Sequence, residues 1–142
     1  QWLVNGEPIS GEIGSSYTPT PDDLDSWISV RVVGSKIGYK TETLDSLEIA
    51  VIAAKMVKTG SAAFTGTTRV GKTLKASSGK WDPGVKLTYR WKRNGAAIKG
   101  ATKSTYKLTS ADNGKTITVA ITGTKLGFET VTKVSSGKKI TK

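Results

Sequence analysis

Residues 87–95 of the chain are Leu87-Thr88-Tyr89-Arg90-Trp91-Lys92-Arg93-Asn94-Gly95, a strand followed by a turn. Leu87, Tyr89 and Trp91 alternate with polar residues, and this period of two gives a strand one buried and one solvated face. Asn94-Gly95 is the strongest short-range signal for a hairpin, because both residues tolerate the positive φ of a type I′ turn. We therefore predict a hairpin whose second strand returns along Ala96 to Ile98.

The same pattern occurs a second time, 89 positions earlier in the chain. When the first 53 residues are aligned without a gap on the last 53, 17 positions are identical. The identical positions are mostly turn residues and regularly placed apolar or aromatic residues, and they include Trp2/Trp91, Asn5-Gly6/Asn94-Gly95, Ile9/Ile98, Tyr17/Tyr106, Asp23/Asp112, Ile28/Ile117, Val30/Val119 and Gly34/Gly123. Because a shared backbone constrains such positions, we predict two tandem repeats of one architecture. Trp2, Trp91, Tyr17 and Tyr106 are the predicted structural core residues.

The period divides the chain into a partial repeat, residues 1–55, and a complete repeat, residues 56–142. The first copy has no counterpart of residues 57–89, so we expect it to lack its opening strands and the chain to be a segment of a longer array. It should then present an unpaired sheet edge and an apolar face around Trp2, which proteins normally cover. Strands from another chain could complete this copy and give a head-to-tail assembly. Whether the opening strands were cut away or are supplied by another chain stays open.

The rest of the chain is predicted to form short strands. In the run 116–122, Ile117, Val119 and Ile121 should point inward, and β-branched residues suit such a pleated surface. Further strands are predicted at residues 62–65, 72–76, 105–108, 130–134 and 138–141, and in the first copy at 1–4, 8–9, 27–33 and 47–53. Many short strands separated by Gly, Asn and Pro turns favour an all-β antiparallel β-sandwich.

Composition restricts the chemistry. The chain has no Cys and no His, which excludes disulfides, thiolate metal sites and the usual catalytic triads. We therefore predict no catalytic residues, no metal site and no cofactor, and a carboxylate-only enzyme is the remaining enzymatic alternative. Asp22, Asp23 and Asp25 could bind calcium, but turn capping is favoured because the second copy has only Asp112 in this region.

The net charge of +11 is unevenly divided. Residues 1–55 carry four Lys+Arg against eight Asp+Glu, net −4, and residues 56–142 carry 18 against three, net +15. Such a basic surface indicates an anionic partner or a solubilising role. Since the basic residues are spread over nearly all predicted strands and turns, nucleic acid is disfavoured. No apolar run approaches the length of about 20 residues needed to span a bilayer, so no membrane insertion is expected.

Several motifs of the second copy resemble the tandem immunoglobulin-like repeats of secreted and surface-anchored proteins of Gram-positive bacteria, especially high-GC ones. The motifs are Val70-Gly71-Lys72-Thr73-Leu74, Gly79-Lys80-Trp81-Asp82-Pro83, Tyr89-Arg90-Trp91-Lys92-Arg93-Asn94-Gly95, Ile98-Lys99-Gly100-Ala101-Thr102, Tyr106-Lys107-Leu108-Thr109, Asp112-Asn113-Gly114-Lys115 and Lys125-Leu126-Gly127-Phe128. The resemblance implies an immunoglobulin-like sandwich in which Trp91 and Trp2 occupy the place of the buried Trp on the third strand. It also implies an extracellular or cell-surface location and a spacer, stalk, adhesive or carbohydrate-proximal role.

Two tryptophans are candidate contact residues. Trp81, in a Gly-flanked loop, could stack on a sugar ring, or it could fold back as a plug over the end of the sandwich. Trp27 should point away from the core, where it would contact a neighbouring domain or partner or be shielded by nearby side chains. The sequence thus predicts a non-enzymatic structural module whose partners are neighbouring repeats of the same chain or other copies. The alternative is an accessory module of a secreted hydrolase that recognises polysaccharide or anionic cell-wall polymer.

Overall fold

The computed structural model describes all 142 residues of the chain, and it is all-β, with 43% strand and 4% helix. Its named strands pair only in the antiparallel sense. The chain divides into two compact units, unit 1 (Gln1–Ala54) and unit 2 (Lys55–Lys142). None of the helical segments has the length and apolar character needed to cross a bilayer.

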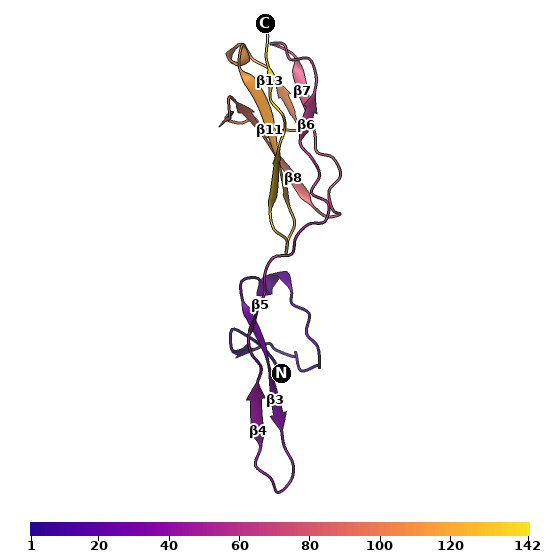
Figure 1. Cartoon of the computed structure of the whole chain (residues 1–142), viewed down its shortest axis with the longest axis vertical. Helices are drawn as coiled ribbons and strands as arrows, with labels where there is room; N and C mark the ends of the chain where they lie inside the picture. Colours follow the sequence, from indigo (N-terminus) through magenta and orange to yellow (C-terminus); the bar gives the residue numbers. More distant parts are fainter. The chain divides into compact units, whose positions relative to one another are not determined.

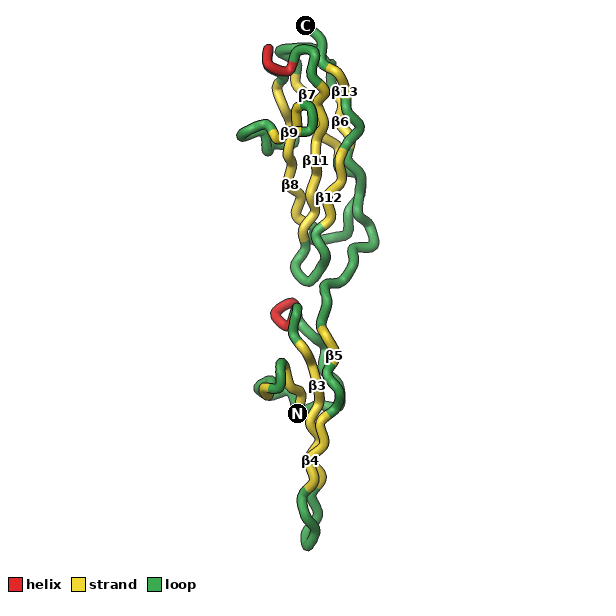
Figure 2. The backbone as a smooth tube through the Cα atoms, turned by 60° about the vertical axis from the view of Figure 1, so that its left-hand side comes forward, coloured by secondary structure: helices red, strands yellow, loops and turns green.

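The larger sheet of unit 2 has five strands. They are β8 (Lys86–Arg93), β9 (Ala96–Ala97), β11 (Thr116–Thr124), β12 (Val131–Val134) and β13 (Lys138–Lys139). The order is β12-β11-β8-β9, and β13 pairs with the other end of β11 (Figures 1 and 2). In the β11–β8 register Val119 lies opposite Trp91, so the two predicted inward-facing runs share one face of the sheet.

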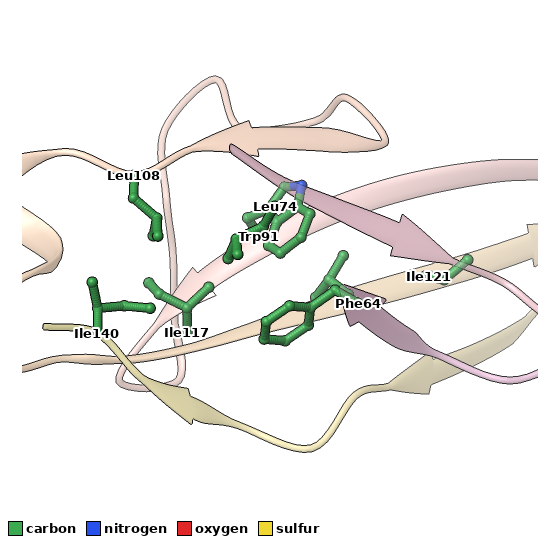
Figure 3. Close-up of a cluster of buried hydrophobic side chains, with 8 residues drawn as sticks. Phe64, Leu74, Trp91, Leu108, Ile117, Ile121 and Ile140 are labelled. Carbon is green, nitrogen blue, oxygen red and sulfur yellow. The ribbon is translucent and has the colours of Figure 1, made fainter. Parts of the chain in front are cut away.

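The smaller sheet of unit 2 faces this surface. It consists of β6 (Ala63–Thr65), β7 (Thr73–Ser77) and β10 (Thr105–Lys107), in the order β10-β7-β6. The core contains inward side chains of both sheets, together with residues of the adjoining loops: Phe64, Leu74, Trp91, Leu108, Ile117, Val119, Ile121 and Ile140 (Figure 3). Since each fully buried large apolar side chain contributes about 1.5–3 kcal/mol, this cluster is the main stabilising element of unit 2. Two antiparallel sheets around one apolar core are compatible with a β-sandwich.

Unit 1 contains a single sheet. Its strands are β1 (Trp2–Val4), β2 (Glu7–Pro8), β3 (Trp27–Gly34), β4 (Glu42–Asp45) and β5 (Ile49–Ala50). The order is β2-β1-β3-β4. In addition, β5 pairs with the start of β3, and Figure 1 shows β4 and β5 along β3. No second sheet packs against it within unit 1, whereas unit 2 has one.

The hairpin turns have the predicted geometry. Asn94 and Gly95 have φ of 48° and 84°, and Asn5 and Gly6 have φ of 50° and 82°. Both pairs therefore occupy the left-handed region that a type I′ turn requires. Each Asn also joins its turn to the first residue of a neighbouring strand. The Oδ1 of Asn94 accepts the N–H of Thr116 in β11, and the Oδ1 of Asn5 accepts that of Trp27 in β3, both at 2.9 Å.

Three details differ from the sequence-based expectation. Strand β4 was not predicted, since all four of its residues are exposed and therefore show no burial pattern. The predicted strand over residues 47–53 is paired only at Ile49–Ala50. Ala120 is buried although it lies in the outward phase of β11. Its small side chain is covered on the outer face of the sheet.

Candidate interaction site

One set of contacts is found in both units, at positions 89 residues apart. The indole Nε1 of Trp91 donates to the carbonyl oxygen of Lys103 at 2.9 Å, and the Nε1 of Trp2 donates to that of Gly14 at 2.9 Å. Both rings pack beside a tyrosine, with centroid distances of 5.7 Å to Tyr106 and 5.9 Å to Tyr17. Each tryptophan thus anchors the loop that follows its hairpin.

The same tyrosines close a second shared motif with an aspartate at a short 3-10 turn. The hydroxyl of Tyr106 donates to Asp112 at 2.9 Å, and that of Tyr17 donates to Asp23 at 2.8 Å. The turns are η2 (Ser110–Asp112) and η1 (Pro21–Asp23), and each carboxylate also accepts the N–H of the threonine three residues earlier. The N–H of Thr20 and the hydroxyl of Tyr17 hold the pKa of Asp23 below its usual value.

The two aspartates differ in one partner. In unit 2 the Nε of Arg93 donates to Asp112 at 2.7 Å, whereas Val4 stands at the matching position of unit 1. Asp112 is fully buried. Burial alone would raise its pKa, but the N–H of Thr109, the Arg93 guanidinium and the Tyr106 hydroxyl together hold the pKa of Asp112 below its usual value. Each aspartate, in its ionised form, therefore accepts the hydrogen bonds that hold its 3-10 turn, η1 or η2.

Strands β6 and β7 cover the Trp91 face of unit 2. Phe64 meets Trp91 edge-on, with ring centroids 5.4 Å apart and an interplanar angle of 66°, and both rings are buried (Figure 3). Leu74 of β7 lies opposite Tyr106 of β10. The Nζ of Lys138 lies over the Phe64 ring, 5.0 Å from its centroid, and donates to the Phe64 carbonyl oxygen at 3.3 Å. Edge-on aromatic pairs add about 0.5–1.5 kcal/mol beyond burial. Phe64 therefore stabilises the packing of the smaller sheet on the larger one.

The matching face of unit 1 is an open apolar groove of about 860 Å³. Trp2, Tyr17, Ile28, Val30, Ile49 and Val51 are among its lining residues. Exposure shows the contrast with unit 2, since Ile121 is 0% exposed and its counterpart Val32 is 60% exposed. The only charged residue in the lining is Glu48. We call this surface the open face.

The edge of the open face beside Tyr17 is not paired. In unit 2 the matching segment is β10, which pairs with β7 and is flanked by bonds such as Ala76 N–H to Ser104 O at 2.8 Å. In unit 1, residues 15–18 form no strand, and their backbone N–H groups donate no hydrogen bond within the chain. Unpaired backbone groups at the edge of a sheet are a template for an incoming strand.

Trp81, the first candidate contact residue, folds back against β11. Its Nε1 donates to the carbonyl oxygen of Ser78 at 2.8 Å, and the residue is half-buried against the core of unit 2. A Cβ at Gly123 or at Gly60 would overlap the indole ring. Gly123 is thus a strand glycine required by the close approach of Trp81. Of the two alternatives for this residue, the geometry favours the plug.

Trp27, the second candidate, lies at the start of β3 and is 51% exposed. Its neighbour Ile28 is buried, and so is Ser29, although Ser29 lies in the same phase of the strand as Trp27. Trp27 lies opposite Ala50 of β5 in the strand register, at the end of the unit 1 sheet. Its exposed surface is available for contact with a partner.

The acidic residues near η1 do not form a metal site. No group of three or more acidic side chains lies close enough to hold an ion. Asp23 instead caps its turn through Thr20. The close approach of Trp81 to Gly123 was not predicted from the sequence, although the identity of Gly34 and Gly123 in the two copies was a usable signal. Comparison with family models, with curated proteins and with solved structures found no match for the chain.

Proposed function

We propose that the chain is a non-enzymatic extracellular structural module, made of tandem immunoglobulin-like repeats, that acts as a spacer, stalk, adhesin or surface-filament building block. The observation that carries this proposal is the recurrence of the same internal contacts 89 residues apart. Trp2 and Trp91, with their acceptors Gly14 and Lys103, represent that set. The recurrence extends to the later strands, where the hydroxyls of Ser46 and Ser135 accept the N–H of Val30 and Val119, both at 3.0 Å.

Repetition explains how such a module would work. In a repeat protein, stability is approximately a sum of the intrinsic stability of each unit and of the contacts between neighbours. Unit 2 has its own closed core, so further units of this kind can be added without redesign of the core. A longer array then extends the reach of whatever domain it carries.

Small-angle X-ray scattering on chains with two, three and four successive copies of residues 55–142 tests the spacer role. The proposal predicts that the maximum dimension grows by a constant increment with each copy, while the cross-sectional radius stays constant. A maximum dimension that stops growing, or a cross-section that thickens with each copy, would contradict a spacer.

A second candidate is an accessory module that binds anionic cell-wall polymer. The observation in its favour is that, of the 18 Lys+Arg in residues 56–142, only Arg93 forms a salt bridge. Unpaired surface cations attract polyanions. Salt screens this attraction, with a Debye length of about 10 Å at 0.1 M.

Retention on immobilised polyphosphate and on cellulose, at low and high salt, tests the second candidate. Polymer recognition predicts retention on polyphosphate that saturates and survives moderate salt. Weak retention that disappears with salt indicates only a charged surface. Retention on neutral cellulose would instead indicate polysaccharide binding, and Trp27→Ala should then weaken it more than Trp81→Ala, because the Trp81 ring is turned into unit 2.

A further inference from the structure

We propose that the open face of unit 1 is an acceptor site for an extended, basic β-forming segment with the chemistry of residues 57–89 of this chain. The segment would add a strand beside Tyr17, place an aromatic ring against Trp2 and place an indole over Gly34. This inference rests on the proposed equivalence of the two units. It goes further because it names the occupant and the residues that receive it.

The distribution of exposed apolar side chains points to unit 1. Of the thirteen large hydrophobic residues exposed in the chain, ten lie in unit 1, although it is the smaller unit. They include Leu47 and Ile49, which line the groove and are 91% and 72% exposed, and Val32 of β3, which is 60% exposed. Concentrated apolar surface of this kind marks an interaction site. In unit 2 the matching face is covered by Phe64 and Leu74.

Gly34 gives an independent sign of what the occupant contains. Its counterpart Gly123 is required because the indole of Trp81 occupies the space of a side chain there. A Cβ at Gly34 would meet nothing within 4 Å. Gly34 is the last residue of β3, and no close contact in the free chain requires a glycine there. A glycine in a strand often marks a site that another group approaches closely. If an incoming indole lay over Gly34 as Trp81 lies over Gly123, Gly34 would leave the space that this ring needs.

The backbone of unit 1 offers the matching hydrogen-bonding edge. Residues 15–18 have free N–H groups, and their counterparts at 104–107 lie along β7. On the other side, Val32 to Gly34 of β3 pair with β4 but have no partner on the β1 side, where β11 pairs with Leu87 to Tyr89. A segment like 57–89 would fill both positions. Strand addition of this kind takes its affinity from main-chain bonds and its specificity from side-chain pockets.

Charge favours the same occupant. Residues 57–89 contain six Lys+Arg and one Asp+Glu, net +5, whereas residues 1–54 contain three Lys+Arg and eight Asp+Glu, net −5. Complementary charge speeds encounter and disfavours wrong partners. Pairing of two open faces of the chain would instead bring together two acidic units, so a second copy docked face to face is disfavoured.

A separate peptide with this sequence should bind to unit 1 and not to unit 2. In unit 2 the site is already filled by a segment joined to it covalently, and such tethering corresponds to an effective concentration of the order of millimolar. The same reasoning disfavours a swap between two chains, since each donated segment would leave a Trp91 face uncovered.

The test uses a fluorescent synthetic peptide with the sequence of residues 57–89 and the full chain. The expected result is saturable binding by fluorescence anisotropy, with new hydrogen-exchange protection at residues 15–18 and 32–34 and no change at 104–107. A peptide carrying Phe64→Ala should bind at least about tenfold more weakly, as for an interface anchor. A peptide carrying Thr65→Ala, whose side chain is exposed on the same strand, is the matched control and should bind as the unmodified peptide does.

A change in the chain itself identifies the site. Gly34→Val should leave the unfolding curve of the free chain unchanged or slightly more stable, because there is open space at this position. It should abolish binding of the unmodified peptide, and a peptide carrying Trp81→Ala should recover part of it.

Three results would overturn the proposal: absence of saturable binding to the folded chain, protection that appears only at 104–107, or protection at 15–18 that rises with chain concentration without peptide. The last result would identify a second copy as the occupant. None of them would alter the scattering result for repeated units, so the acceptor site and the spacer role fail separately.

Discussion

The indole ring of Trp81 occupies the space in which a side chain at Gly123 would lie. This contact joins the loop after β7 to the end of β11 in the larger sheet, 42 residues further along the chain. Gly123→Ala forces the ring out of place and should destabilise unit 2 by about 1–3 kcal/mol, the usual cost of overpacking. Urea unfolding followed by tryptophan fluorescence measures the change.

Gly34→Ala is the matched control for Gly123→Ala. The two glycines hold the same position in their units, but nothing lies within 4 Å of a Cβ at Gly34. The substitution should therefore be neutral or stabilise unit 1 by up to about 1 kcal/mol, since Ala is less flexible than Gly in the unfolded chain. Equal losses of stability for the two variants would show that the environments of the two glycines do not differ in this way.

The second prediction concerns acid. The pKa of Asp112 lies below its ordinary value of 3.8, so the folded state of unit 2 binds fewer protons there than the unfolded state. Its stabilising contribution is present above that ordinary value and is lost as the pH falls through the lower folded-state value. Asp112→Asn should cost about 1–3 kcal/mol at neutral pH, as for loss of an acceptor from buried donors.

The difference in stability between Asp112→Asn and the unmodified chain should shrink as the pH falls below 4, since protonation weakens the same contacts in the unmodified chain. Thermal unfolding at pH values from about 2 to 7, a range that covers the titration of carboxylates, measures this dependence. A difference that stays constant over the range would show that ionisation of Asp112 is not what holds the corner.

Much of the strand pattern could be predicted because it depends on short-range signals. Asn94 and Gly95 determine their turn through backbone φ, and the alternation in β11 determines its buried face. Strand β4 could not be predicted, since an exposed strand defined only by pairing leaves no hydrophobic period.

The candidate site was predicted in part. The sequence analysis expected an apolar face around Trp2, and Trp2 lines the apolar groove of unit 1. The contact between Trp81 and Gly123 and the ion pair between Arg93 and Asp112 were missed. Both join residues far apart in sequence, and no local period encodes such contacts.

The third prediction compares the two candidate contact tryptophans. Trp81→Ala removes a half-buried ring and its hydrogen bond to Ser78, and it should destabilise unit 2 by about 2–4 kcal/mol, somewhat less than loss of a fully buried Trp. Trp27→Ala, at an exposed position, should change stability by no more than about 0.5 kcal/mol. Calorimetry of the two variants measures the contrast, and a larger loss for Trp27→Ala would mean that its ring is engaged within unit 1.

The fourth prediction concerns the order of unfolding. Unit 1 has one sheet and an open apolar face, whereas unit 2 closes two sheets over eight buried side chains. Unit 1 should therefore unfold at a lower urea concentration, so that the full chain shows two transitions. Trp91→Phe should shift only the second transition, because Trp91 lies in the core of unit 2. A single cooperative transition would indicate that the two units do not unfold independently.

Amide hydrogen exchange of the free chain, compared between residues 15–18 and residues 104–107, tests the central claim most directly. These segments carry Tyr17 and Tyr106 and make the same contacts to Asp23 and Asp112, but only the second is paired with another strand. We predict rapid exchange of the Tyr17 N–H and strong protection of the Tyr106 N–H, because only every second N–H of the edge strand β10 faces β7, and Tyr106 lies opposite Leu74 there. Comparable protection of both segments at low chain concentration would contradict the existence of an open face in unit 1.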